Sequence, residues 1–129
     1  MPWRPMAAVA AGGAIGALVR VGVVLALPHQ AAAWPWSTFA VNLAGSFLLG
    51  YGATRLDERL PLSSYRRPLL ATGICGALTT FSTLQVELLR MLDAGRQGLA
   101  AGYALASLSA GLAAVWIATA LARGLLVRR

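Results

Sequence analysis

The apolar stretch from residue 69 to residue 92 contains polar residues whose types and spacing suit the handling of an ion. Thr80, Thr83 and Glu87 stand at i, i+3 and i+7, which places them on one face of a helix. Two glycines and a Thr-Thr-Phe-Ser-Thr run weaken a regular helix here, because glycine lowers helix propensity and hydroxyls compete for backbone groups. A broken membrane helix exposes carbonyl oxygens that can coordinate a hard cation. The pattern predicts a break and a hydroxyl path to one carboxylate; the alternative is a merely kinked helix.

Two further polar residues stand inside apolar runs, where they are costly and indicate a cavity or a partner. Asn42 has Thr38 four residues before it and Ser46 four residues after it, so the three form one polar stripe on a helix. The alternative for Asn42 is a hydrogen bond between packed helices. Arg20 either faces a cavity or extends its side chain to the membrane interface.

Tyr103 and Ser107 are one helical turn apart in the last apolar run, and Gly111 follows one turn later. They are candidates for the lining of the same path, with core packing as the alternative. Glycines four residues apart also occur, a pattern that lets membrane helices approach closely. These pairs are Gly12 with Gly16 and Gly98 with Gly102.

The composition of the chain favours a membrane protein. Of its 129 residues, 58% are hydrophobic and 12% are charged, whereas an average soluble domain has about 25% charged residues. A helix needs about 20 apolar residues to cross the hydrocarbon core of a bilayer. We therefore expect one all-α membrane domain over residues 1–129, with a break in the third of four transmembrane helices. The expected spans are 6–27, 37–54, 69–92 and 98–122.

The arginines are unevenly distributed along the chain. They flank the apolar runs and form no patch with interleaved aromatic residues, which argues against a nucleic-acid partner. With four spans, the termini and the second connection share one side of the membrane, and Arg90 and Arg96 lie on the other. Because arginine-rich ends stay in the cytoplasm, both termini are expected there. The arginines on the terminal side are Arg4, Arg55, Arg59, Arg66, Arg67, Arg123, Arg128 and Arg129.

The sequence excludes two kinds of site and argues against a cleaved signal peptide. One cysteine and one histidine allow neither an internal disulfide nor a Cys/His metal cluster. The first apolar run has a cleaved signal peptide as its alternative, since residues 31–33 are all alanine, but Arg20 and the length of the run argue against cleavage.

Three runs of the sequence together resemble the Fluc (CrcB) family of fluoride channels. The resemblance covers nearly the whole chain, and its most specific part is the Thr-Thr-Phe-Ser-Thr run. It implies a four-helix subunit that pairs antiparallel with a second subunit in a dual-topology dimer, with two narrow pores and a central structural sodium ion. The three runs are residues 12–17 with Arg20, residues 38–47 and residues 76–83.

The resemblance also implies roles for single residues. Backbone carbonyls of Gly76 and Thr79, from both subunits, would hold the sodium ion. Asn42 would be a pore amide and Phe81 a pore-facing phenylalanine, and Arg20 would line an aqueous vestibule. The candidates for the rest of the polar pore lining are Ser82, Thr83, Glu87, Tyr103 and Ser107.

The sequence departs from the family pattern in three ways. Leu84 stands where the family usually has its second phenylalanine, and Gly111 stands where a second serine would follow Ser107. In addition, dual topology calls for balanced flanking charge, whereas the arginines here favour one side. An oppositely oriented paralogue is therefore an alternative to the homodimer as the second subunit.

The function that the resemblance implies is passive export of cytoplasmic fluoride through the plasma membrane of a bacterium, which reduces fluoride toxicity. The sequence shows neither an ATP site nor a redox centre, so we expect a channel and not an enzyme. One alternative is a small proton-coupled drug exporter, but such proteins rely on a carboxylate in the first span, and this first span has none. The other alternative is a non-conducting membrane scaffold, in which the polar residues serve only packing.

Overall fold

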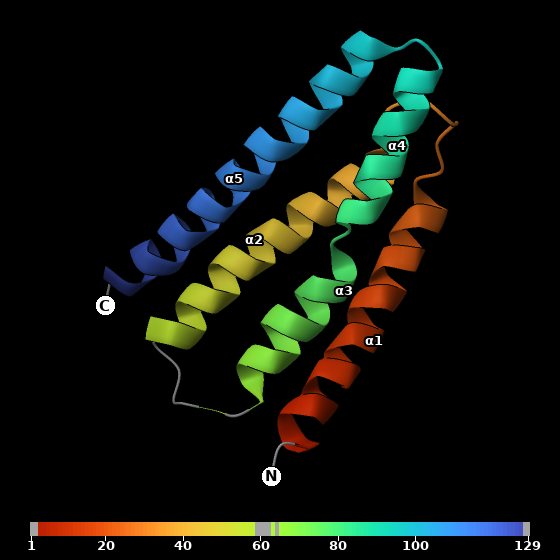
Figure 1. Cartoon of the computed structure of the whole chain (residues 1–129). Coiled ribbons are helices and arrows are strands. Elements are labelled where there is room, and N and C mark those ends of the chain that lie inside the picture. Colours follow the sequence, from red (N-terminus) through yellow and green to blue (C-terminus); the bar gives the residue numbers. More distant parts are fainter. Residues whose placement is uncertain (1–2, 59–62, 64, 128–129) are drawn as a thin grey trace.

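The structure is a computed structural model that describes residues 3–58, 63 and 65–127. The described part consists of helices and connections, and it contains no strand. The helices lie side by side along the length of the molecule (Figure 1). They are α1 (Trp3–Ala26), α2 (Trp36–Glu58), the π-helix η1 (Pro68–Cys75), α3 (Gly76–Leu78), α4 (Phe81–Asp93) and α5 (Gln97–Val127).

Prolines and one glycine lie at the helix boundaries. Pro28 follows the end of α1, Pro35 precedes α2, and Pro68 is the first residue of η1, where its missing N–H costs nothing. The turn between α4 and α5 contains Gly95 at φ +76°, a left-handed conformation that glycine adopts without steric strain. These residues explain why the apolar runs separate into individual helices.

Three of the predicted spans match helices that are long and apolar enough to cross a membrane: Trp3–Ala26, Pro68–Asp93 and Gln97–Gly124. The remaining predicted span, 37–54, falls on α2. This helix has 23 residues, but its hydropathy is lower than that of these three helices. The polar stripe of Thr38, Asn42 and Ser46 lowers the hydropathy of this helix. Part of α2 is therefore suited to contact with other helices and less suited to lipid.

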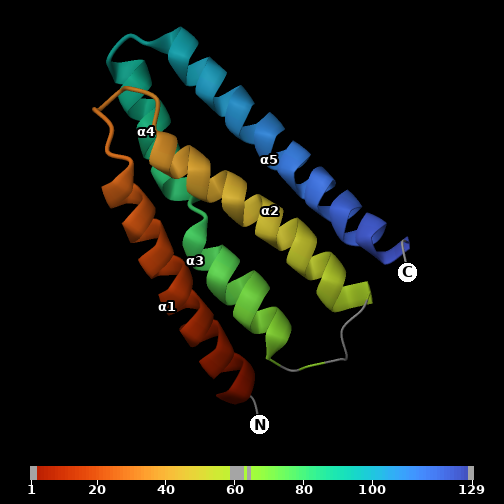
Figure 2. The same ribbon diagram turned by 180° about the vertical axis from the view of Figure 1, so that it is seen from behind.

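The helices form two closely packed groups that meet at α2. α1 packs mainly against η1 and α3, and α2 packs mainly against α5 (Figures 1 and 2). The start of α1, the end of α2, the start of η1 and the end of α5 all lie at one end of the molecule. Arg90 near the end of α4 and Arg96 just before α5 belong to the opposite end, as the sequence predicts. Arg59, Arg128 and Arg129 lie outside the described residues.

Glycine allows the close contact between α1 and η1. Gly12 and Gly16 are buried, and a Cβ at either position would collide with a backbone carbonyl, that of Leu69 or of Ile74. The predicted close approach at this pair is therefore confirmed. The other pair behaves differently, since a Cβ at Gly98 or at Gly102 would meet no described atom within 4 Å.

We expect Gly12→Ala to lower the free energy of unfolding by about 1–3 kcal/mol, because the added methyl group forces two helix backbones apart. Gly13→Ala is the matched control, since a Cβ at Gly13 would meet no atom of the described residues within 4 Å. Thermal unfolding of the purified variants in detergent measures the difference. Equal unfolding midpoints for the two variants would show that this contact does not set the position of α1.

Candidate functional site

The third apolar segment is broken after Leu78. Thr79 (φ −79°, ψ 153°) and Thr80 (φ −146°, ψ 118°) have extended backbones, and α4 begins at Phe81. This geometry agrees with the break that the sequence predicts. The eight-residue π-helix before the break was not predicted from the sequence.

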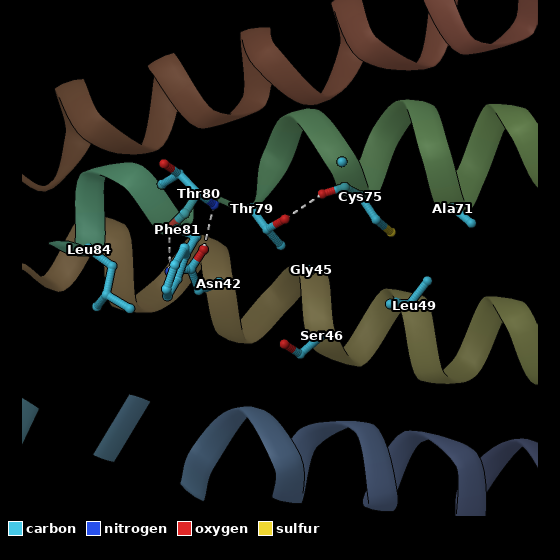
Figure 3. Close-up of a pocket in the computed structure, with 11 residues that line it drawn as sticks. Asn42, Gly45, Ser46, Leu49, Ala71, Cys75, Thr79, Thr80, Phe81 and Leu84 are labelled. Atoms are coloured by element: carbon cyan, nitrogen blue, oxygen red, sulfur yellow. Dashed lines mark hydrogen bonds between the residues drawn. The ribbon is translucent and has the colours of Figure 1, made fainter. Parts of the chain in front are cut away.

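The side chain of Asn42 pairs with the backbone at the break. Its Oδ1 accepts a hydrogen bond from the N–H of Thr80 at 2.8 Å, and its Nδ2 donates to the carbonyl of Thr80 at 3.1 Å (Figure 3). An amide side chain can make this pair because it carries both a donor and an acceptor. Asn42 thus satisfies both backbone groups of Thr80 from a helix that lies 38 residues earlier in the chain.

The same hydrogen bonds release two carbonyl oxygens from the helix. In a continuous α-helix the N–H of Thr80 would bond to the carbonyl of Gly76, and the N–H of Thr83 to the carbonyl of Thr79. Here Thr80 donates to Asn42, and Thr83 donates instead to the hydroxyl of Thr80 at 3.2 Å. The carbonyl oxygens of Gly76 and Thr79 therefore lose their helical donors and become possible ligands for a hard cation.

A groove of about 380 Å³ runs along the break (Figure 3). Its walls come from α2, η1, α3 and α4, and none of the described residues that line it is charged. Phe81 is 71% exposed, whereas Leu84 is partly buried and packs against the core of Met91, Ala100 and Tyr103. The residues of the groove that matter most for its chemistry are Asn42, Ser46, Gly76, Thr79, Phe81 and Leu84.

A second polar cluster surrounds the buried carboxylate of Glu87, which is 6% exposed. Thr38 Oγ1 donates to Glu87 Oε1 at 2.6 Å, and the Tyr103 hydroxyl donates to Oε2 at 2.8 Å. His29 Nε2 lies 3.9 Å from Oε1. Both carboxylate oxygens are thus held by hydroxyl donors from α2 and α5, so the cluster ties α4 to both helices.

A cavity of about 320 Å³ adjoins this cluster and is lined by His29, Thr38, Ser82, Thr83, Glu87 and Arg90, among others. The predicted hydroxyl path is continuous at its start, since Thr80 donates to the hydroxyl of Thr83 at 3.0 Å. Glu87 lies farther along the same helix and shares this cavity with Thr83.

Most of the predicted site residues therefore belong either to the groove or to the surroundings of Glu87. Ser107 and Arg20 belong to neither. Ser107 has a buried hydroxyl without a hydrogen-bond partner among the described residues, and it lines a small cavity with Asn42 and Ser46. Arg20 is half-buried on α1 and lines none of these three cavities. Sequence reasoning missed His29, a lone histidine in a connection, because nothing in the sequence shows that the connection reaches Glu87.

We expect Asn42→Leu to lower the free energy of unfolding by about 1–3 kcal/mol for each group that it leaves unpaired, because the N–H and carbonyl of Thr80 both lose their partner. Asn42→Asp keeps the acceptor but replaces the donor by a second carboxylate oxygen that faces the Thr80 carbonyl, so its effect should be at least as large. Thr54→Val is the control, since the one side-chain hydrogen bond of Thr54 within the described residues goes to Gly50 of its own helix. Unfolding of the three variants in detergent gives the ranking. An Asn42→Leu protein as stable as the Thr54→Val protein would contradict this role.

Comparison with known proteins adds independent evidence. The family model described as "CrcB-like protein, Camphor Resistance (CrcB)" matches residues 7–119. The Fluoride-specific ion channel FluC 1 of Mycolicibacterium paratuberculosis is 59% identical over 127 residues, which cover 98% of this chain and 96% of that protein. The Fluoride-specific ion channel FluC of Acidobacterium capsulatum is 44% identical, with 84% of this chain and 88% of that protein covered.

These bacterial relatives are named as ion channels, which confirms the prediction that the chain is not an enzyme. Together with the three helices that are apolar enough to cross a bilayer, they indicate a multi-pass bacterial membrane protein. The resemblance on three sequence runs is also confirmed, since both the family match and the identity extend over nearly the whole chain. This protein belongs to the CrcB family.

Proposed function

We propose that this protein is a fluoride-specific channel through which cytoplasmic fluoride leaves the cell passively. The observation that carries the proposal is the 59% identity, over nearly full length, to a protein named as a fluoride-specific ion channel. Hydrogen fluoride enters a cell as a neutral weak acid and ionises in the more alkaline cytoplasm. The trapped anion then leaves down its electrochemical gradient, and its loss reduces toxicity without any energy-consuming step.

The chemistry of the groove supports this proposal. A fluoride ion that loses its water needs N–H and O–H donors or the positive edges of aromatic rings. Asn42 has a second N–H beyond the one that Thr80 uses, Ser46 has a hydroxyl, and Phe81 presents its ring at the same groove. Because the described residues of the lining include no fixed cation, the ion can be stabilised without being trapped. On this proposal Ser82, Thr83, Glu87, Tyr103 and Ser107 line the rest of the path, and Arg20 lines a vestibule.

A second, antiparallel subunit would complete the pore. The groove is open, and an aromatic ring that is 71% exposed at a membrane-helix break is suited to contact with a partner. The partner is either a second copy of this chain or an oppositely oriented paralogue. A paralogue would also supply the phenylalanine for which this chain has Leu84.

The test of the function is fluoride efflux from liposomes that contain the purified protein. We expect fluoride to leave rapidly under a membrane potential, while chloride is retained. Phe81→Ala should reduce the efflux by at least tenfold, because it removes the aromatic edge from the groove. The matched control is Leu89→Ala, a large exposed apolar residue on the same helix that does not line the groove. If correctly assembled protein shows no fluoride efflux, the channel proposal is wrong and the non-conducting scaffold is the alternative that remains.

A structural sodium ion fits the two released carbonyls. Gly76 and Thr79 each offer a backbone oxygen without its helical donor, and the same pair from a second subunit would bring the number of oxygen ligands to four. Backbone oxygens suit a hard cation, and such an ion would supply the positive charge that holds the broken helices of two subunits together. It is not transported.

Exchange of sodium for N-methyl-D-glucamine during purification should abolish fluoride efflux, because the two subunits lose the ion between their carbonyls. Returning sodium before reconstitution should restore the efflux, which separates loss of the ion from irreversible damage. The amount of dimer, measured in parallel by crosslinking, should fall and recover in the same way. Unchanged efflux after verified removal of sodium would contradict the site at Gly76 and Thr79.

The distribution of arginine predicts that most copies insert with cytoplasmic termini. Trp3→Cys in a Cys75→Ala background gives one labelling site near the amino terminus, and Gln97→Cys in the same background gives one at the opposite end. A membrane-impermeant thiol reagent applied to intact cells should label the second site far more than the first. Equal labelling of both sites, together with robust fluoride efflux from this chain alone, would exclude the need for a paralogue.

A further inference from the structure

The side chain of Thr79, the first extended residue at the break, is held by two different contacts. Its hydroxyl donates to the carbonyl of Cys75 at 2.8 Å, and the same carbonyl accepts the N–H of Thr79 at 3.0 Å. Threonine has few side-chain conformations. The one that directs the hydroxyl at Cys75 also directs the methyl group, Cγ2, at Gly45 of α2. Figure 3 shows Thr79 beside Cys75 and above Gly45.

Gly45 leaves the space that this methyl group occupies. Gly45 is buried, and a Cβ at this position would overlap Cγ2 of Thr79. The methyl group is only one bond from the Thr79 Cβ, so it moves away only if the side chain turns and loses its hydrogen bond to Cys75. The alternative is that α2 moves away from the break. Asn42 lies on the same face of α2, three residues before Gly45, so this movement would lengthen its hydrogen bonds to Thr80.

Gly52, on the same helix, makes a comparable contact with a different consequence. A Cβ at Gly52 would overlap Cδ2 of Leu70 in η1. This methyl group lies at the far end of a flexible side chain, which can turn to another conformation without moving a backbone. Leu70 also lies outside the break. A comparison of the two glycines therefore separates close packing of α2 from an effect on the break itself.

We infer that Gly45 is the positioning residue of the break: it accepts the methyl group of Thr79 and so fixes the backbone of Thr79 and the direction of its carbonyl. This carbonyl lacks its helical donor, because the N–H of Thr83 donates to the hydroxyl of Thr80. In the proposed function the Thr79 carbonyl is a ligand of the structural sodium ion. The effect of Gly45 on sodium rests on that proposal, whereas its effect on the backbone depends only on contacts within one subunit.

A cycle of single and double variants tests the contact between Gly45 and Thr79. Gly45→Ala should lower the unfolding midpoint in detergent, because its methyl group overlaps that of Thr79. Thr79→Ser removes Cγ2 and keeps the hydroxyl, so the double variant should unfold at the midpoint of Thr79→Ser alone. Thr79→Val keeps a methyl group and loses the hydroxyl, so it should not rescue Gly45→Ala. An unchanged midpoint in Gly45→Ala, or a lowered one that Thr79→Ser does not rescue, overturns the inference.

A sodium titration separates control of the carbonyl from close packing alone. We expect Gly45→Ala to raise the sodium concentration that gives half of the crosslinked dimer by about 10- to 100-fold, with N-methyl-D-glucamine keeping the ionic strength constant. Adding Thr79→Ser should reverse this change, and Gly52→Ala should leave the concentration unaltered. An equal rise in both glycine variants, or no rise in Gly45→Ala, overturns the inference.

The two tests also separate failure of this inference from failure of the proposed function. If the dimer of the unaltered protein forms independently of sodium, the proposed sodium site is wrong. The unfolding midpoints of the variant cycle then still decide whether Gly45 positions Thr79, because they depend neither on sodium nor on fluoride.

Discussion

The pairing of the Asn42 amide with the backbone of Thr80 is the interaction on which the rest of the site depends. Two extended residues in the middle of a membrane helix leave peptide groups without helical hydrogen-bond partners. Such unpaired groups lower the stability of a protein in an apolar environment. Asn42 provides for both groups of Thr80, and the Thr80 hydroxyl caps the first turn of α4. The break is therefore stable. It leaves the carbonyl oxygens of Gly76 and Thr79 without helical donors, and it leaves the side chain of Phe81 exposed.

The helices that carry these groups are fixed on both sides of the break. On one side, Gly12 and Gly16 allow α1 to approach η1 and α3 closely. On the other side, Glu87 accepts hydrogen bonds from Thr38 on α2 and Tyr103 on α5. Because Thr38 and Asn42 are one turn apart on α2, a single face of that helix holds both the carboxylate and the break. This arrangement explains why α2 is the least apolar of the long helices.

The local features of this site could be predicted from the sequence, whereas most pairings between distant residues could not. The break follows from the glycines and hydroxyls around Thr80, and the stripe on α2 follows from a spacing of four residues. The partner of Asn42 depends on the register between α2 and the broken helix, which no local pattern encodes. The same holds for the contact of His29 with Glu87. The π-helix before the break also lacks a local signal, because its apolar residues would fit an α-helix equally well. The roles of the site residues, the dimer and the sodium ion stay predictions.

Thr79 and Thr80 are extended within the membrane segment, and Asn42 holds Thr80 in this conformation. Solid-state NMR of the protein in lipid bilayers measures this directly through the ¹³Cα and ¹³Cβ chemical shifts of the two threonines. We expect shifts typical of extended backbone at both residues, between helical shifts at Leu78 and Phe81. In the Asn42→Leu protein we expect the two threonines to return toward helical values, or the protein to unfold. Helical shifts at both threonines in the unaltered protein would contradict it.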